Sequence, residues 1–253
     1  MLNAPDVAQG GLVQRLRAAT ADLLLGSGCA GCARPGLGLC PECERALRGR
    51  PTTAWPDPTP TALVDPEPLV PVAAGDYDGP LRSCLLQFKE NHRIGLLDPL
   101  ARTLVAAVEG AAPDDRLVLV PMPSRGSVVR DRGYDAVRLL AVRAARRLRR
   151  RGRDVRVACA LRHRSTVRDQ AGLSSRQRLQ NLTGALSARP TPGGRSVVLV
   201  DDVITTGASM AEAARVLRGC GTPASRIAVI AATRRRASPP TSRPAEGWRR
   251  RCW

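Results

Sequence analysis

A run of thirteen residues, 197–209, constrains the fold of this chain more than any other part of its sequence. It reads VVLVDDVITTGAS: an apolar stretch, two neighbouring aspartates, and a small turn rich in hydroxyl groups. Four consecutive apolar residues favour a buried strand, and the turn has the small residues that open a helix. Ligands of open α/β sheets bind outside the carboxyl ends of the strands. The run therefore predicts a strand, a turn and a helix, with a ligand site at the turn.

The two polar parts of this run suit different parts of one ligand. A turn at a helix N-terminus presents free backbone N–H groups, which bind phosphate together with nearby hydroxyls. Asp201 and Asp202 accept hydrogen bonds from vicinal hydroxyls, either directly or through the waters of a Mg²⁺ ion. An isolated Asp-Asp pair is read as a cap or a solvated strand end, so the interpretation depends on all thirteen positions being in register. The phosphate-binding candidates are Thr205, Thr206, Gly207, Ala208 and Ser209.

The apolar pattern outside this run predicts the same class of fold. Residues 117–120 and 227–231 are apolar runs of the kind that form buried parallel strands. Residues 136–149 and 210–217 have the apolar spacing of helices. Strands that alternate with helices imply an α/β fold with an open, mostly parallel sheet. Because only 2% of the residues are aromatic, aliphatic side chains must fill its core.

Composition divides the 253 residues into one main domain and smaller flanking parts. An amphipathic helix over residues 12–24 and a cysteine-rich module precede a stretch too dense in proline for a regular element. We interpret that stretch as a linker, and the basic, proline-rich C-terminal residues as a disordered tail. The expected parts are a helix and zinc-binding module at 1–49, the linker at 50–71, the α/β domain at 72–233 and the tail at 234–253.

Two C-x-x-C knuckles near the N-terminus predict a metal site. They are CAGC and CPEC, separated by seven residues that include two glycines. Each knuckle supplies two thiolates from one turn, and the glycines allow the chain to double back around a tetrahedral ion. A redox C-x-x-C is the alternative, but two knuckles in tandem favour a closed, structural Zn²⁺ site. The expected ligands are Cys29, Cys32, Cys40 and Cys43.

Two further loops add basic residues to the expected ligand edge of the sheet. The strand predicted at 117–120 runs into a loop where the pyrophosphate half of such a ligand would lie, and the arginines of this loop could neutralise it by forked hydrogen bonds. In isolation such a loop is usually a solvated turn, and its place after a buried strand is what favours a ligand role. Residues 161–182 are polar and basic, which suits a mobile lid and a solvated connection equally. The candidates in the first loop are Ser124, Arg125, Arg130 and Arg132.

The charge of the chain fits anionic partners. Arginine and lysine number 40 against 22 acidic residues, which gives a net charge of +18, and Lys89 is the only lysine. Such a chain attracts nucleic acid or phosphorylated metabolites, although a GC-rich genome also raises the arginine content. With so few aromatic side chains, binding to DNA would be mainly electrostatic. The two histidines, His92 and His163, lie among arginines and are expected at the surface.

The sequence contains no segment that predicts secretion or membrane insertion. The first residues lack the basic region of a signal peptide, and no window approaches the ~18 apolar residues of a membrane span. We therefore expect a cytoplasmic protein, in which thiols stay reduced.

In combination, these motifs resemble the ComF family, whose ComFC and GntX-like members join a cysteine-rich module to a type I phosphoribosyltransferase domain. The matching elements lie within residues 29–233 and are CAGC with CPEC, the VPMP loop, RGY, RHRSTVRDQAGLSSRQRLQNLTGA and VVLVDDVITTGAS. The resemblance implies a phosphoribosyl-pyrophosphate site that works with Mg²⁺. In it, Asp201 and Asp202 hold the ribose hydroxyls and serve catalysis, and residues 205–209 hold the 5′-phosphate.

The resemblance leaves more than one class of function open. Family members are associated with natural competence and DNA uptake, which implies single-stranded DNA or DNA-uptake proteins as partners. Transfer of phosphoribose to an unknown acceptor is one reading; the alternatives are a non-catalytic protein that handles single-stranded DNA and a sensor of phosphoribosyl pyrophosphate. The chain departs from the family at Ala136, where glutamine is frequent, and at Ser124 and Arg125, which replace a common Leu-His. The oligomeric state stays open, with a homodimer among the options.

Overall fold

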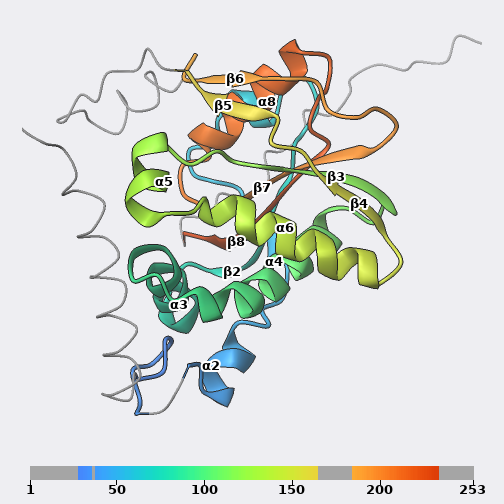
Figure 1. The fold of residues 1–253 in the computed structure, drawn as a ribbon. Helices are drawn as coiled ribbons and strands as arrows, with labels where there is room; N and C mark the ends of the chain where they lie inside the picture. The colour runs from blue at the N-terminus through green and yellow to red at the C-terminus, as the bar shows by residue number, and fades with distance from the viewer. Residues whose placement is uncertain (1–27, 36–37, 165–183, 234–253) are drawn as a thin grey trace, which may run out of the picture.

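The fold is a six-stranded sheet covered by helices on both faces (Figure 1). It is seen in a computed structural model that describes residues 28–35, 38–164 and 184–233. The predicted helix at 12–24, most of the predicted lid at 161–182 and the predicted tail at 234–253 lie outside these residues. Among the helices that are described, none has both the length and the apolar character needed to cross a bilayer.

The sheet is almost entirely parallel. Every neighbouring pair of strands is parallel except the first, in which two residues at the edge run antiparallel to their partner. The predicted α/β class with an open, mostly parallel sheet is confirmed. In spatial order the strands are β1 (Thr52–Thr53), β2 (Pro71–Asp76), β8 (Arg226–Ala232), β7 (Ser196–Ile204), β3 (Arg116–Pro121) and β4 (Asp154–Val157).

The central strands are apolar throughout because both of their faces are covered. Val198 and Val200 of β7 point into one core cluster, and Val197 and Leu199 point into the other. This alternation is the period of two that a strand imposes. The longer helices of the first face are α3 (Gly79–Glu90), α4 (Leu97–Ala111) and α6 (Ala136–Arg150), and the second face carries α8 (Ala208–Gly219).

Short elements complete the covering of the sheet. β5 (Leu161–His163) and β6 (Leu186–Ala188) form a separate antiparallel pair beside α8. Two of the remaining helices are of the 3₁₀ type and two are short α-helices. They are α2 (Pro41–Ala46), η1 (Thr61–Leu63), η2 (Ile94–Leu96) and α5 (Gly126–Arg132).

The segment predicted as a linker, residues 50–71, packs into the domain. It contains β1 and η1, and the side chains of Trp55 and Leu63 are buried in the same core cluster as α8. Its prolines exclude long regular elements, as expected, but its few large apolar side chains still need burial and find it against α8. Through this packing the segment reaches the turn before α8, described next.

Candidate functional site

The predicted acidic pair lies where β7 extends past its neighbour β3. The last register pair between the two strands joins Pro121 to Val200, whereas β7 continues beside β8 as far as Ile204. Asp201 and Asp202 therefore follow the point at which one side of β7 loses its partner strand. The backbone N–H of Asp202 donates to Oδ1 of Asp201 at 2.8 Å, which orients the Asp201 carboxyl relative to the backbone of β7.

The turn that follows the pair requires glycine at one position. Gly207 has a φ of +71°, a left-handed conformation that costs other residues strain. A Cβ at this position would lie 2.7 Å from Cγ of Pro56, so the packed segment 50–71 also excludes a side chain here. Gly207 is the N-cap of α8 and Ala208 is the first residue of that helix, while Thr205 and Thr206 are exposed. The turn thus presents the open N-terminus of a twelve-residue helix.

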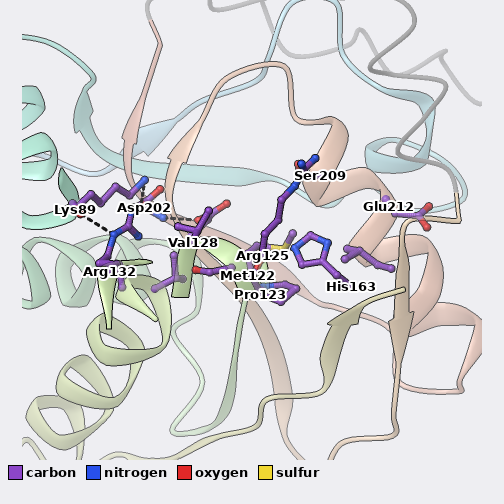
Figure 2. Close-up of a pocket in the computed structure, with 15 residues that line it drawn as sticks. Lys89, Met122, Pro123, Arg125, Val128, Arg132, His163, Asp202, Ser209 and Glu212 are labelled. Atoms are coloured by element: carbon purple, nitrogen blue, oxygen red, sulfur yellow. Dashed lines mark hydrogen bonds and ion pairs between the residues drawn. The ribbon is translucent and has the colours of Figure 1, made fainter. Parts of the chain in front are cut away.

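A cavity of about 300 Å³ lies at this carboxyl edge of the sheet (Figure 2). Six of the predicted site residues line it: Asp201, Asp202, Ser209, Ser124, Arg125 and Arg132. Arg130 is exposed on α5 and lies outside the set of lining residues, as do the four residues 205–208. The remaining walls are Lys89, Met122, Pro123, Val128, Ala136, Val137, His163, Leu186 and Glu212. Polar groups of both charges therefore converge on one space.

Burial of the acidic pair perturbs its ionisation. Burial of the Asp201 carboxyl and, after it, repulsion by the neighbouring Asp202 carboxylate raise the pKa of Asp201 well above its ordinary value. The ammonium of Lys89 acts in the opposite direction on that pKa. The site thus places two carboxyl groups where water shields their charges poorly, which disfavours ionisation of Asp201 beside Asp202.

Lys89 is a site residue that the sequence analysis did not identify. It is near the C-terminal end of α3, and its Nζ forms an ion pair with Oδ2 of Asp202, whose side chain is only 5% exposed. The available signal was composition: a chain with 40 basic residues has a single lysine. No spacing rule links that lysine to an aspartate more than a hundred residues later.

The predicted phosphate-binding arginines differ in their surroundings. Arg132 is largely buried, and its Nε donates to the backbone carbonyl of Lys89 at 2.6 Å. Its guanidinium also reaches Glu90, with 3.3 Å between NH2 and Oε1. Ser124 donates to Asp135 at 3.1 Å, and Asp135 in turn caps α6. Arg132 therefore ties α5 to the end of α3.

His163 and Glu212 form the end of the cavity remote from Lys89 (Figure 2). His163 is exposed, as expected, and its Nε2 lies 2.9 Å from the carbonyl oxygen of Pro123. Glu212 is buried on α8 and accepts from the backbone N–H of Gly184 at 2.8 Å as well as from Arg215. Although burial opposes ionisation, Arg215 and Gly184 lower the pKa of Glu212, so this carboxylate is charged and already partnered.

The four predicted metal ligands come together in a second site. The sulfur atoms of Cys29, Cys32, Cys40 and Cys43 all lie within 4.8 Å of one another. Cys29 Sγ accepts from the N–H of Cys40 at 3.2 Å and of Gly31 at 3.4 Å. Burial opposes ionisation of this thiol, but these N–H groups bring the pKa of Cys29 down to about 6. Four close sulfurs with backbone donors fit one metal ion such as zinc.

The cysteine module contacts the main domain through α3, α4 and the loop between them. Thr103 of α4 donates to the carbonyl of Leu47 at 2.8 Å, and Arg93 donates to the carbonyl of Gly28 at 3.0 Å. Gly31 lies so close to Pro80 of α3 that a Cβ on it would be 3.2 Å away. The N-terminal half of α3 therefore faces the cysteines, and its C-terminal end faces Asp202.

Comparison with known proteins identifies a family and several relatives of this chain. Residues 101–248 match the phosphoribosyl transferase domain family. The chain is 34% identical over 198 residues to the DNA utilization protein YhgH of Escherichia coli, covering 75% of this chain and 82% of the relative. It is 33% identical over 161 residues to competence protein F of Haemophilus influenzae, covering 59% and 67%. A solved structure of the allosteric regulatory enzyme of purine biosynthesis is similar over 54% of this chain and 26% of that chain, with 17% identity and a TM-score of 0.32. The family assignment rests on the sequence matches.

Proposed function

Because this chain belongs to the phosphoribosyl transferase domain family, with ComF-family proteins as relatives, we propose that its cavity binds phosphoribosyl pyrophosphate together with Mg²⁺. The observation that carries the proposal is the position of Asp201 and Asp202. They line a cavity of about 300 Å³, at the place where β7 extends past β3 and a five-residue segment before α8 begins. Carboxylates and an open helix terminus match the hydroxyls and the phosphate of one ligand.

Each part of the proposed ligand has its own group of residues. Asp201 and Asp202 accept from the ribose 2′ and 3′ hydroxyls, and the turn of residues 205–209 holds the 5′-phosphate at the helix N-terminus. The loop after β3 lines the cavity with Ser124 and Arg125 and would add hydrogen-bond donors and positive charge for the phosphate groups of the ligand. The carboxylates of half-buried Asp201 and buried Asp202 are the hard oxygen donors that Mg²⁺ prefers. When bound, the cation would supply positive charge that the diphosphate needs in order to leave.

The chemistry that this arrangement supports is transfer at C1 of the ribose. The bond from C1 to the diphosphate oxygen would break and a bond from C1 to a nitrogen of the acceptor would form, with the diphosphate released. The chain contributes by orienting the ribose and by neutralising the diphosphate, without a covalent nucleophile. The acceptor stays open, and binding without transfer, as in a sensor, is the alternative that kinetic assays separate.

For the cysteine module we propose one structural Zn²⁺, held by Cys29, Cys32, Cys40 and Cys43. Four sulfur ligands complete a tetrahedral shell and leave no position for a substrate. The module would thus stabilise the N-terminal part of a protein that we expect in the cytoplasm.

Calorimetric titration with phosphoribosyl pyrophosphate and Mg²⁺ tests the proposed cavity. The double variant Asp201→Asn with Asp202→Asn is expected to lose measurable binding, because amides neither neutralise the cation nor accept as carboxylates do. The chain offers a matched control in Asp114 and Asp115, a second adjacent pair that is exposed before β3. Their double Asn variant changes the charge equally and should bind like the unaltered chain. Equal binding by both double variants would refute the assignment.

A second candidate function, handling of single-stranded DNA, is favoured by the net charge of +18 and by similarity to a DNA utilization protein and a competence protein. Exposed arginines on α6, among them Arg138, Arg149 and Arg150, offer an electrostatic surface. Fluorescence anisotropy with a labelled oligonucleotide would measure this binding at several salt concentrations. Electrostatic binding predicts an affinity that falls steeply with salt, and salt-independent or absent binding would exclude this candidate.

A further inference from the structure

The end of α3 brings the only lysine of the chain to the acidic pair. Lys89 forms its ion pair with Asp202 from the wall of the cavity, and its side chain is 26% exposed against 5% for Asp202. The ammonium thus has access to the cavity, whereas the carboxylate is enclosed. Lysine carries a compact charge on a flexible stem, so its head can change partners without movement of the helix.

Hydrogen bonds to the carbonyl groups of Lys89 and of the preceding residue, Phe88, hold the backbone at the end of α3. Arg132 donates to the carbonyl of Lys89 at 2.6 Å, and the hydroxyl of Tyr134 donates to the carbonyl of Phe88. The ring of Tyr134 also packs against Phe88, with 5.5 Å between centroids. These contacts fix the helix end, so the position of Lys89 beside the cavity is built into the fold.

The same contacts define what Arg132 does. Its side chain is 11% exposed, and its nitrogens serve the Lys89 carbonyl and Glu90. An arginine used in this way holds the protein together rather than reaching for a ligand. By holding the backbone of Lys89, Arg132 positions the Lys89 ammonium at the cavity.

The position of Lys89 relative to the other site residues indicates which part of a ligand it would meet. In the view of Figure 2, Lys89 and Arg132 lie on one side of Asp202, and Ser209 lies on the other. On a ribose, the substituents at C1 and C5 lie on opposite sides of the edge that carries the 2′ and 3′ hydroxyls. With the hydroxyls at Asp202 and the 5′-phosphate near Ser209, the C1 side faces Lys89.

We propose that Lys89 is a ligand-binding residue that exchanges Asp202 for the C1 diphosphate of phosphoribosyl pyrophosphate. In the empty site the ammonium neutralises the enclosed carboxylate. On binding, the ribose hydroxyls donate to Asp202, and the ammonium turns to the diphosphate oxygens. Arg132 is the positioning residue of this exchange. The other ionisable side chains that line the cavity are Arg125, Asp201, His163 and Glu212. This inference rests on the proposed function and extends it to a residue outside the sequence motifs.

A single lysine allows a test that requires no substitution. An amine-selective ester can modify only the side chain of Lys89 and the chain's amino terminus, and peptide mass spectrometry separates the two. With Mg²⁺ present, saturating phosphoribosyl pyrophosphate should slow modification of Lys89 several-fold, whereas ribose 5-phosphate, which has no diphosphate, should have little effect. The amino terminus serves as the internal reference. Unchanged modification of Lys89 at saturation would overturn the inference.

Substitution provides the second arm of the test. Lys89→Met should weaken binding of phosphoribosyl pyrophosphate about 10- to 100-fold, as expected for loss of one charge-assisted hydrogen bond, and should leave ribose 5-phosphate binding much less affected. Lys89→Arg keeps the charge and should recover part of the loss. Arg218→Met removes one exposed positive charge at the end of α8, away from the lining residues, and should bind normally. Equal losses for both ligands, or none, would show that Lys89 is only a structural counter-ion. Absence of binding by the unaltered chain would instead overturn the proposed function itself.

Discussion

The acidic pair and the cysteine cluster both gather groups that repel one another when charged, but they are held in different ways. Asp201 and Asp202 are neighbours on a central strand, and Lys89 supplies a positive charge from within the chain. The four cysteines come from two separate knuckles. Around Cys29, the groups that stabilise a thiolate are backbone N–H donors from Gly31 and Cys40. The acidic site is therefore formed by the fold, whereas in our proposal the cysteine site is completed by a bound ion.

This difference predicts that loss of metal and changes near the acidic pair affect different parts of the protein. The acidic pair belongs to a strand flanked on both faces by core clusters, and the module is attached to the domain by a few contacts at α3 and α4. Loss of metal should open the module alone. Changes at the turn before α8 should affect the sheet and its ligand together.

The largest effect is expected from Cys43→Ser. Cys43 is 3% exposed, and burial raises the pKa of its thiol, so that a bound metal is what favours the thiolate. We expect the metal content to fall from about one ion per chain to none, measured by elemental analysis of protein purified without chelators. The module should lose about 4 kcal/mol, the stabilisation that a ligand gives at roughly 1,000 times its Kd.

The control is Cys220→Ser, at the half-buried end of α8, where a hydroxyl can replace the thiol as donor to Leu217. It should leave the metal content unchanged. If the two sites are held separately, Cys43→Ser should also leave binding in the cavity nearly intact. A parallel loss of ligand binding would show that loss of the metal site displaces Lys89 through α3. The two sites would then not be held separately.

A smaller effect is expected from Gly207→Ala. The added Cβ would clash with Pro56, and the alanine backbone would have to adopt a left-handed conformation. Together these effects should lower the free energy of unfolding by about 2–3 kcal/mol. Ligand binding should weaken as well, because relief of the clash moves the turn before α8. Gly219→Ala is the matched control on the same helix: nothing lies within 4 Å of its Cβ, and the change should be neutral or stabilising. Denaturant unfolding of both variants measures the difference, and equal stabilities would show that segment 50–71 yields to the methyl group.

The sequence predicted those features whose residues are close together along the chain. The run 197–209 shows its strand, acids and turn in order, and the two knuckles show their ligand spacing. Lys89 and Glu212 were missed because their partners, Asp202 and Gly184, are brought to them only by packing of distant segments. The linker interpretation failed to anticipate β1 and η1 for a related reason, since proline density describes local chain stiffness and says little about where Trp55 is buried.

The smallest effect that we expect is a gain in stability from Asp201→Asn. Burial and then Asp202 raise the folded-state pKa of Asp201 above its ordinary value of 3.8, so the folded chain holds a proton that the unfolded chain has lost. Stability therefore falls as pH rises from 3.8 through the raised pKa, and the Asn variant escapes this loss. At neutral pH its Tm should therefore be higher than that of the unaltered chain, as thermal unfolding of both proteins would measure.

The same substitution should weaken binding of phosphoribosyl pyrophosphate. Asp201→Asn should thus raise the stability of the protein and lower its affinity for the ligand. The amide oxygen can still accept from the N–H of Asp202, which means that the fixed geometry survives and only the charge is lost. The difference in Tm between variant and unaltered chain should shrink as the pH is lowered and vanish below 3.8, where the Asp201 carboxyl is protonated in the folded and the unfolded chain alike. A lower Tm for the variant at neutral pH would mean that the fold is stabilised by this carboxylate rather than strained by it. The acidic pair would then be a structural cluster held by Lys89, and the contrast with the cysteine module would lose its functional meaning.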